Sequence, residues 1–283
     1  MTEKPLILLG AARSGTKFLR DQIAQDPAVR HIPYDVNYVW RYGNDAMPDD
    51  VLDPRRLSEK HARNIRATLK KLASLENNRG RILEKTVSNT LRIPFIEKIY
   101  PDACYLHLVR DGRAVIESAH RMWQNPPDKM GLFRKLKDLP LQHYTYVWWF
   151  GVNYIKGLTK GRQGGAIWGP RYPNILSDIE NLSLFEVVTK QWNISVETAS
   201  VDMSQISESR KLTVKYEDLL SDITLTNISN FCGLTDPDNF KLRMHKSFRP
   251  ENKLKWKERL DTKQIEIIEK LAEKSLKRYG YLS

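Results

Sequence analysis

The sequence predicts an α/β fold with a P-loop-like parallel sheet that helices flank on both faces. Short apolar runs alternate with longer segments of helical periodicity, and a turn that contains two glycines follows the first run. Strands that alternate with helices are joined by right-handed crossovers, which cover a parallel sheet on both sides. The 283 residues contain no internal repeat, low-complexity tract or polar linker, so we expect a single domain over residues 1–283.

Short apolar runs bounded by turn residues are expected to form the strands. They are Leu6–Leu9, Arg81–Glu84, Cys104–Val109 and 212–215. Helical spacing predicts helices over 16–25, 54–77, 91–100, 112–123 and an aromatic-rich stretch at 141–159. The helices expected over 16–25, 91–100 and 112–123 each follow a predicted strand.

The composition restricts the class of protein. A formal net charge of +12 favours an anionic partner, such as a phosphorylated small molecule, an acidic polymer or nucleic acid. The longest apolar clusters are far shorter than the roughly 20 residues of a membrane-spanning helix. The first residues show no secretory signal pattern, and the two cysteines show no metal-ligand pairing. We therefore expect a cytoplasmic protein that spans no membrane.

The turn after the first strand is a candidate anion site. Backbone N–H groups between a strand and a helix bind phosphate readily, and the turn spans residues 10–17. The glycine spacing is that of a nucleotide-triphosphate loop, but Thr16 precedes Lys17, whereas such a loop has lysine before the hydroxyl residue. The inverted order moves the magnesium-binding hydroxyl and argues against ATP hydrolysis, although a P-loop kinase stays the alternative enzyme class.

A second candidate anion site follows the third predicted strand. Arg110 stands at the end of this strand and Ser118 lies on the helix after it, so the two side chains can converge on one phosphate. A guanidinium fork and a hydroxyl together make a suitable monophosphate clamp. Each residue alone is also compatible with an ordinary surface role.

These two motifs, with Glu84-Lys85-Thr86, Asn89 and the stretch 214–220, resemble those of the PAPS-dependent sulfotransferase family. The style of the first loop is most similar to the tyrosylprotein and bacterial glycan branches. The resemblance implies the sulfotransferase fold and the donor 3′-phosphoadenosine-5′-phosphosulfate (PAPS), with no metal. It also implies the donor-binding residues, which are Arg13, Ser14, Gly15, Thr16, Lys17, Phe18, Arg110, Ser118, Arg249 and Lys255.

The resemblance also suggests the residues of the reaction. We expect Arg13 and Lys85 to stabilise the leaving phosphate, and a carboxylate about 20 residues after the loop to act as base. Asp35 is preferred over His31, and Asp26 is expected to cap or end the first helix. The family tends to have glutamate in place of this aspartate and proline in place of Val87.

The acceptor is expected to be a carbohydrate hydroxyl of a glycan or glycolipid precursor, because the lack of an N-terminal anchor fits a cytosolic enzyme. Aromatic side chains in the segments expected around the acceptor stack on sugar, tyrosyl and phenolic rings alike. Tyrosyl and phenolic hydroxyls stay open as alternatives. The aromatic residues concerned are Tyr34, Tyr38, Trp40, Tyr144, Tyr146, Trp148, Trp149, Trp168 and Tyr172. The non-enzyme alternative, a nucleic-acid binder, has no zinc spacing, aromatic RNA-binding signature or basic tail in its favour.

Overall fold

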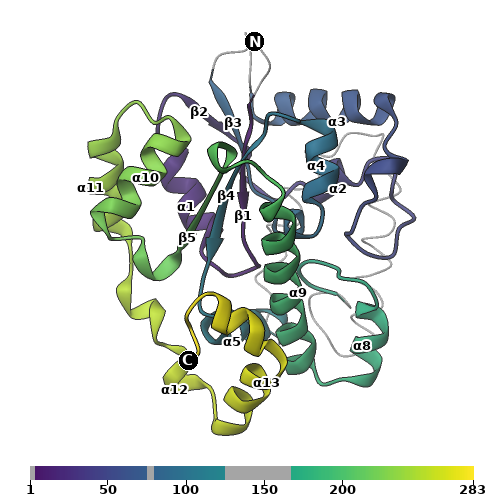
Figure 1. The fold of residues 1–283 in the computed structure, drawn as a ribbon, viewed down its shortest axis with the longest axis vertical. Coiled ribbons are helices and arrows are strands. Elements are labelled where there is room, and N and C mark those ends of the chain that lie inside the picture. The colour runs from purple at the N-terminus through teal and green to yellow at the C-terminus, as the bar shows by residue number, and fades with distance from the viewer. Residues whose placement is uncertain (1–3, 75–79, 125–166) are drawn as a thin grey trace.

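The fold is built on one five-stranded, wholly parallel sheet, seen in a computed structural model that describes residues 4–74, 80–124 and 167–283 (Figure 1). The strand order is β2-β3-β1-β4-β5. The strands are β1 (Leu6–Leu9), β2 (Val29–His31), β3 (Arg81–Glu84), β4 (Cys104–Val109) and β5 (Lys211–Lys215). The predicted fold class is confirmed, and the short edge strand β2 is an addition to it.

Helices account for most of the remaining described chain. The α-helices are α1 (Thr16–Ile23), α2 (Asn37–Trp40), α3 (Glu59–Leu72), α4 (Ile93–Ile99), α5 (Gly112–Gln124), α8 (Ile175–Asn181), α9 (Leu184–Ser204), α10 (Asp222–Cys232), α11 (Pro237–Ser247), α12 (Trp256–Arg259) and α13 (Thr262–Arg278). Short 3₁₀ turns are η1 (Pro54–Arg56), η3 (Val87–Leu91), η5 (Glu208–Arg210), η6 (Tyr216–Asp218) and η7 (Pro250–Lys253). The helix expected over 54–77 is therefore divided, and the stretch 141–159 lies outside the described residues.

The two faces of the sheet bury different helices, as alternating side chains of a strand require. Ile7 and Leu9 of β1 pack with residues of α2, α3 and α4, whereas Leu6 and Leu8 pack with residues of α1, α10 and α11. Figure 1 shows these two groups on opposite sides of the sheet, with α5, α12 and α13 gathered at its lower end. Helices thus cover both faces.

The direction of the crossovers reverses next to β1. Helix α1 leads from β1 to β2 on one side, whereas α4 leads from β3 across β1 to β4 on the other. In such a sheet the loops that follow β1 and β4 lead to opposite faces of the sheet. They leave between them a crevice where ligands bind. The loop after β1 and the start of α5 after β4 flank this crevice.

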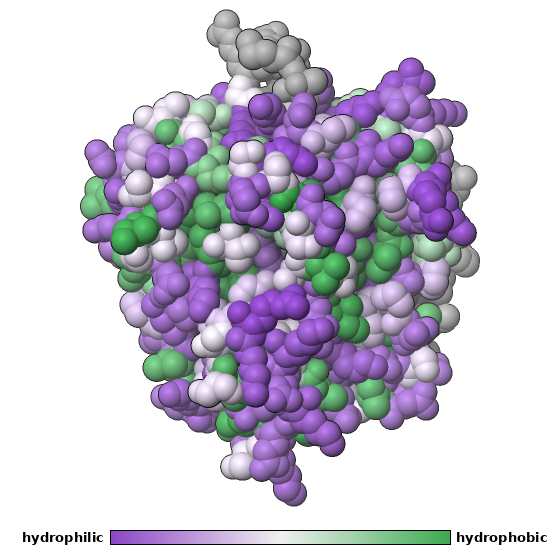
Figure 2. All heavy atoms as spheres, viewed as in Figure 1, coloured by the Kyte–Doolittle hydropathy of each residue, from purple (hydrophilic) through white to green (hydrophobic). Residues whose placement is uncertain are grey.

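Hydrophilic side chains cover most of the face shown in Figure 2, and apolar ones lie between them in small groups. Among the described residues, no helix combines the length and the apolar character that crossing a membrane requires.

Candidate active site

The loop between β1 and α1 has a backbone that only certain residues adopt easily. Arg13 has φ 75° and Gly15 has φ 99°, both in the left-handed region. A Cβ at position 15 would stand 2.7 Å from the ring of Tyr216, so glycine lets this ring pack on the loop. Helix α1 has no side-chain cap, and its first backbone N–H groups therefore point toward the crevice without an intrahelical partner.

The interior of this loop fits an anion. The hydroxyl Oγ of Ser14 is buried and has no hydrogen-bond partner among the described residues. A Cβ at Gly10 would lie 2.6 Å from Thr16 Cγ2, so the loop is tightly closed on itself. A buried, unsatisfied donor costs free energy, and a bound anion would satisfy it together with the helix N–H groups. Lys17 is exposed, and the ring of Phe18 contacts that of Phe248.

The structure brings the two predicted anion motifs together. Arg13 Nε donates to Ser118 Oγ over 3.1 Å, and Arg110 Nη1 donates to the carbonyl of Arg13 over 3.2 Å. The guanidinium of Arg110 stacks 4.3 Å from the ring centre of Tyr216, and its Nε is buried with no partner among the described residues. Desolvation by the surrounding chain, and then the charges of Arg121 and Arg110, lower the pKa of Arg13. This crowding of positive charge favours an anion at the same place.

The segment around η7 contacts this site through Asn252. The backbone carbonyl of Asn252 accepts from Arg110 Nη2, and its side-chain Oδ1 accepts from Lys255 Nζ over 2.8 Å. Arg249 is exposed at the start of η7. Lys255 therefore stands beside the site, and Arg249 lies at its margin.

Asp35 and Lys85 form an ion pair at the carboxyl ends of β2 and β3. Lys85 Nζ donates to Asp35 Oδ1, and the backbone N of Val87 donates to Asp35 Oδ2 over 3.2 Å. The ammonium is nearly buried, with 8% of its side chain exposed, whereas the carboxylate keeps 27%. The lysine thus contacts a carboxylate 50 residues earlier in the chain and not its neighbour Glu84.

The other candidates for the base have different surroundings. His31 stands on the edge strand β2, where burial and then the charge of Arg20 lower its pKa. Asp26 does not end a helix at its own position, because α1 ends at Ile23. Instead its carboxylate accepts from the backbone N of Thr235 over 2.8 Å and joins the loop before α11 to the turn between α1 and β2.

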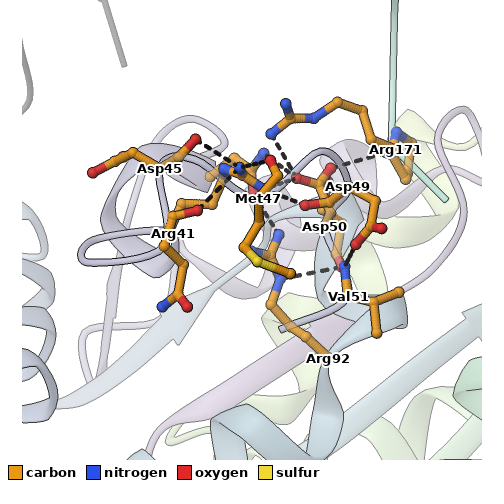
Figure 3. Close-up of polar contacts among 12 residues, drawn as sticks. Arg41, Asp45, Met47, Asp49, Asp50, Val51, Arg92 and Arg171 are labelled. Atoms are coloured by element: carbon orange, nitrogen blue, oxygen red, sulfur yellow. Dashed lines mark hydrogen bonds and ion pairs between the residues drawn. The ribbon is translucent and has the colours of Figure 1, made fainter. Parts of the chain in front are cut away.

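A buried cluster that the sequence did not suggest lies behind the Asp35–Lys85 pair. Figure 3 shows the guanidiniums of Arg41, Arg92 and Arg171 arranged around the carboxylate of Asp50. Asp50 Oδ1 accepts from Arg41 over 3.1 Å and from Arg171 over 3.0 Å, and all four side chains are almost completely buried.

The Asp50 cluster joins three distant segments. Ser88 Oγ of η3 donates to Asp50 Oδ2 over 2.8 Å, and the backbone N of Arg171 donates to the same oxygen over 2.9 Å. Asn37 bridges Asp50 and Arg92 through its side-chain amide. The segments that carry Asp35 and Lys85 are thereby held against residue 171, which follows the undescribed stretch.

The aromatic residues divide into core and surface. Tyr38, Trp40 and Tyr172 are buried in hydrophobic clusters, so the expectation that they line an acceptor surface is wrong. Trp168 and Tyr34 are half-buried. The aromatic residues 144–149 lie outside the described residues.

In the described ranges, no group of three or more His, Cys, Asp or Glu side chains is arranged to hold a metal ion.

The chain is thus an α/β protein with a doubly wound parallel sheet, and its two basic motifs flank the switch point of that sheet. The chain belongs to the sulfotransferase family, whose profile matches residues 5–148. These residues include Arg13, Asp35, Lys85, Arg110 and Ser118, whereas Arg171, Tyr216 and the segment around η7 lie beyond them. No curated protein matches the chain.

Solved structures with a similar fold are also sulfotransferases. The sulfotransferase domain from the curacin biosynthetic pathway has a TM-score of 0.51 and 14% identity, over 95% of this chain and 97% of that one. The sulfotransferase domain of the Synechococcus PCC 7002 olefin synthase has a TM-score of 0.48 and 18% identity, over 95% and 96%. Mouse sulfotransferase SULT7A1 complexed with PAP has a TM-score of 0.47 and 14% identity, over 96% and 84%.

Proposed function

We propose that the protein transfers a sulfuryl group from PAPS to an acceptor hydroxyl, which we take to be that of a carbohydrate. One observation carries this proposal: Arg13 of the first loop bonds to Ser118, and Arg110 bonds to the carbonyl of Arg13. The two anion motifs are therefore neighbours, which is required if both are to bind one bisphosphorylated adenosine. Family membership supports the same reaction class.

The first loop would hold the 5′-phosphosulfate. The uncapped N-terminus of α1, the buried hydroxyl of Ser14 and the side chain of Thr16 supply donors to it, and Gly15 and Lys17 complete the loop. Phe18, packed on Phe248, would border the nucleotide.

Arg110 and Ser118 would hold the 3′-phosphate, which distinguishes PAPS from ATP. Asn252 orients Arg110, and Tyr216 supports its guanidinium from one side. Lys255 and Arg249 would add positive charge from the segment around η7. We propose no metal for this donor, because basic side chains and N–H groups supply the charge.

The proposed base is Asp35, which would take the proton of the acceptor hydroxyl while the acceptor oxygen bonds to sulfur. The bond between sulfur and the bridging oxygen breaks, and the negative charge moves to the 5′-phosphate. Lys85 holds Asp35 through its ammonium group and, with Arg13, stabilises the leaving phosphate. His31 is the alternative base.

The acceptor ring would stack on an aromatic side chain near the site. The half-buried Trp168 offers an aromatic face for a sugar ring or for a tyrosyl or phenolic ring. Incubation of the enzyme with PAPS and separate panels of glycans, glycolipid precursors, phenols and tyrosyl peptides would decide among them. A cytosolic location belongs to the same proposal, and fractionation of the source cells would test it.

The donor is tested by calorimetry with 3′-phosphoadenosine 5′-phosphate (PAP) against ADP. We expect PAP to bind more tightly without magnesium. Equal affinities for PAP and ADP would contradict the proposal. Tighter binding of ADP that requires magnesium would also favour the P-loop kinase.

A further inference from the structure

We propose that Glu84 is a positioning residue for the proposed transfer, whose carboxylate acts through the hydroxyl of Thr86 to fix the segment that carries Asp35. This inference rests on the proposed function, because it assigns Asp35 the role of base. Glu84 itself is completely buried and touches no solvent, so it has no direct contact with a substrate.

Both oxygens of Glu84 accept hydrogen bonds from the segment that follows β3. Thr86 Oγ1 donates to Glu84 Oε1 over 2.5 Å, and Asn89 Nδ2 donates to Oε2 over 2.6 Å. A carboxylate is the only form of this side chain that is an acceptor at both oxygens. Glu84 thus fixes the direction of the Thr86 hydroxyl.

The hydroxyl of Thr86 passes this order to the neighbouring loop. Because its hydrogen points to Glu84, its lone pairs face the backbone N of Val36, which donates to it over 2.9 Å. Val36 directly follows Asp35, whose own carboxylate is held by Lys85 and by the backbone N of Val87. Three hydrogen bonds therefore join residues 84–87 to residues 35–36, and Glu84 orients the group that accepts one of them.

A glutamine at this position would have the same shape but a different pattern of hydrogen bonds. Its amide would direct N–H groups at either Thr86 or Asn89, both of which donate to Glu84 now. One buried donor would lose its partner, and the Thr86 hydroxyl would be free to turn away from Val36.

Protonation of Glu84 would change the hydrogen bonds that its two oxygens accept. Burial raises its pKa to about 7, and the charged groups that face it from neighbouring elements are Asp35, which raises the pKa, and Arg92, which lowers it. As the pH falls below about 7, protonation removes one acceptor from Thr86 or Asn89. The segment that carries Asp35 should then become less ordered, and the rate of sulfuryl transfer should fall.

The first test needs no substrate. In amide NMR spectra of the wild-type protein, the signals of Val36 and Val87 should shift together with a midpoint near the pKa of about 7. In Glu84→Gln these shifts should be lost. Asp202→Asn is the matched control, because burial raises the pKa of Asp202 to about 6 on α9, which carries none of the proposed site residues. Wild-type signals that stay still, or that move equally in Glu84→Gln, would overturn the proposal.

The second test measures the rate of PAP release from PAPS with the acceptor found in the panels, or with water. Glu84→Gln and Thr86→Val should lower kcat about 10- to 100-fold with unchanged affinity for PAP, as small misplacements of a reacting group do. Thr86→Ser, which keeps the hydroxyl, should restore the rate. If Glu84→Gln does not fold, the two Thr86 variants decide; equal rates in Thr86→Val and wild type would overturn the proposal. Lack of PAP binding in every protein would instead refute the proposed function, while the NMR result would still decide the role of Glu84.

Discussion

Arg13 Nε lies 3.1 Å from Ser118 Oγ and donates a hydrogen bond to it, although 105 residues separate the two in the chain. The residue proposed for the 5′ end of the donor thus contacts the residue proposed for its 3′-phosphate. A sulfuryl donor that binds here must replace the hydrogen bond between Arg13 and Ser118 with hydrogen bonds to its own oxygens. The Arg13–Ser118 contact therefore marks the point where the two anion sites meet.

Ser118→Ala should reduce the preference for PAP over ADP. A hydrogen bond to a charged group contributes about 1.5–3 kcal/mol, so the affinity for PAP should fall roughly 10- to 100-fold. The affinity for ADP should change little, because ADP has no 3′-phosphate. Calorimetry with both ligands measures this, with Ser177→Ala on the exposed face of α8 as the control. An equal loss for both ligands would contradict a role in 3′-phosphate recognition.

Arg13→Gly and Arg13→Ala should both abolish turnover but differ in stability. The left-handed conformation of Arg13, with φ 75°, is strained for any residue with a Cβ and unstrained for glycine. We expect Arg13→Gly to unfold at a higher denaturant concentration than Arg13→Ala, by about 1 kcal/mol in the free energy of unfolding. Equal stabilities would show that the loop stores no strain here, and normal turnover in either variant would remove Arg13 from the mechanism.

Sequence patterns can propose those parts of the candidate site that depend on local order along the chain. Arg110 at the end of β4 and Ser118 on α5 belong to one strand-helix unit, so the motif itself suggested a joint role, which stays a prediction. The Asp35–Lys85 pair depends on β2 lying beside β3, and β2 was missed because its three residues include Arg30 and His31. No local sequence pattern predicts an ion pair between two residues that are 50 positions apart.

Local sequence patterns also fail to predict some larger features of the fold. Helix α9 buries side chains on more than one face, so its 21 residues show no clear amphipathic stripe. The Asp50 cluster joins residues from three distant segments, and each of its arginines alone resembles a surface charge. Only the assembled fold shows that these charges are buried together.

Asp35→Asn should lower kcat by about 100- to 10,000-fold, the usual effect of losing a general base. The amide keeps the shape of the side chain but cannot take the proton of the acceptor. His31→Ala is the comparison, because His31 is the alternative base. This variant should keep most of the rate, since His31 lies on the edge strand β2 near Arg20 of α1. The measurement is kcat for each protein at saturating PAPS. Full activity in Asp35→Asn with a large loss in His31→Ala would exchange the two roles.

Asp50→Asn should destabilise the fold, and the loss should depend on pH. Burial alone would raise the pKa of Asp50, but the guanidiniums of Arg171, Arg92 and Arg41 outweigh this effect and hold the pKa well below its ordinary value. A carboxyl with a depressed pKa in the folded state stabilises the protein above its unfolded pKa of about 4 and loses this contribution as the pH falls. At neutral pH the loss of the buried charge should cost about 3–5 kcal/mol.

The decisive comparison is urea unfolding of wild type and Asp50→Asn at about pH 7 and about pH 3. Asparagine does not titrate, so protonation of Asp50 affects only the wild type, and the stability difference should narrow by about 1 kcal/mol at the lower pH. Asp53→Asn is the control, because Asp53 pairs with the exposed Arg55 at the surface, so its loss should change the stability little at either pH. A difference of the same size at both pH values would mean that the arginines do not depend on the charge of Asp50. In that case the Asp50 cluster would hold its three segments by packing and neutral hydrogen bonds alone.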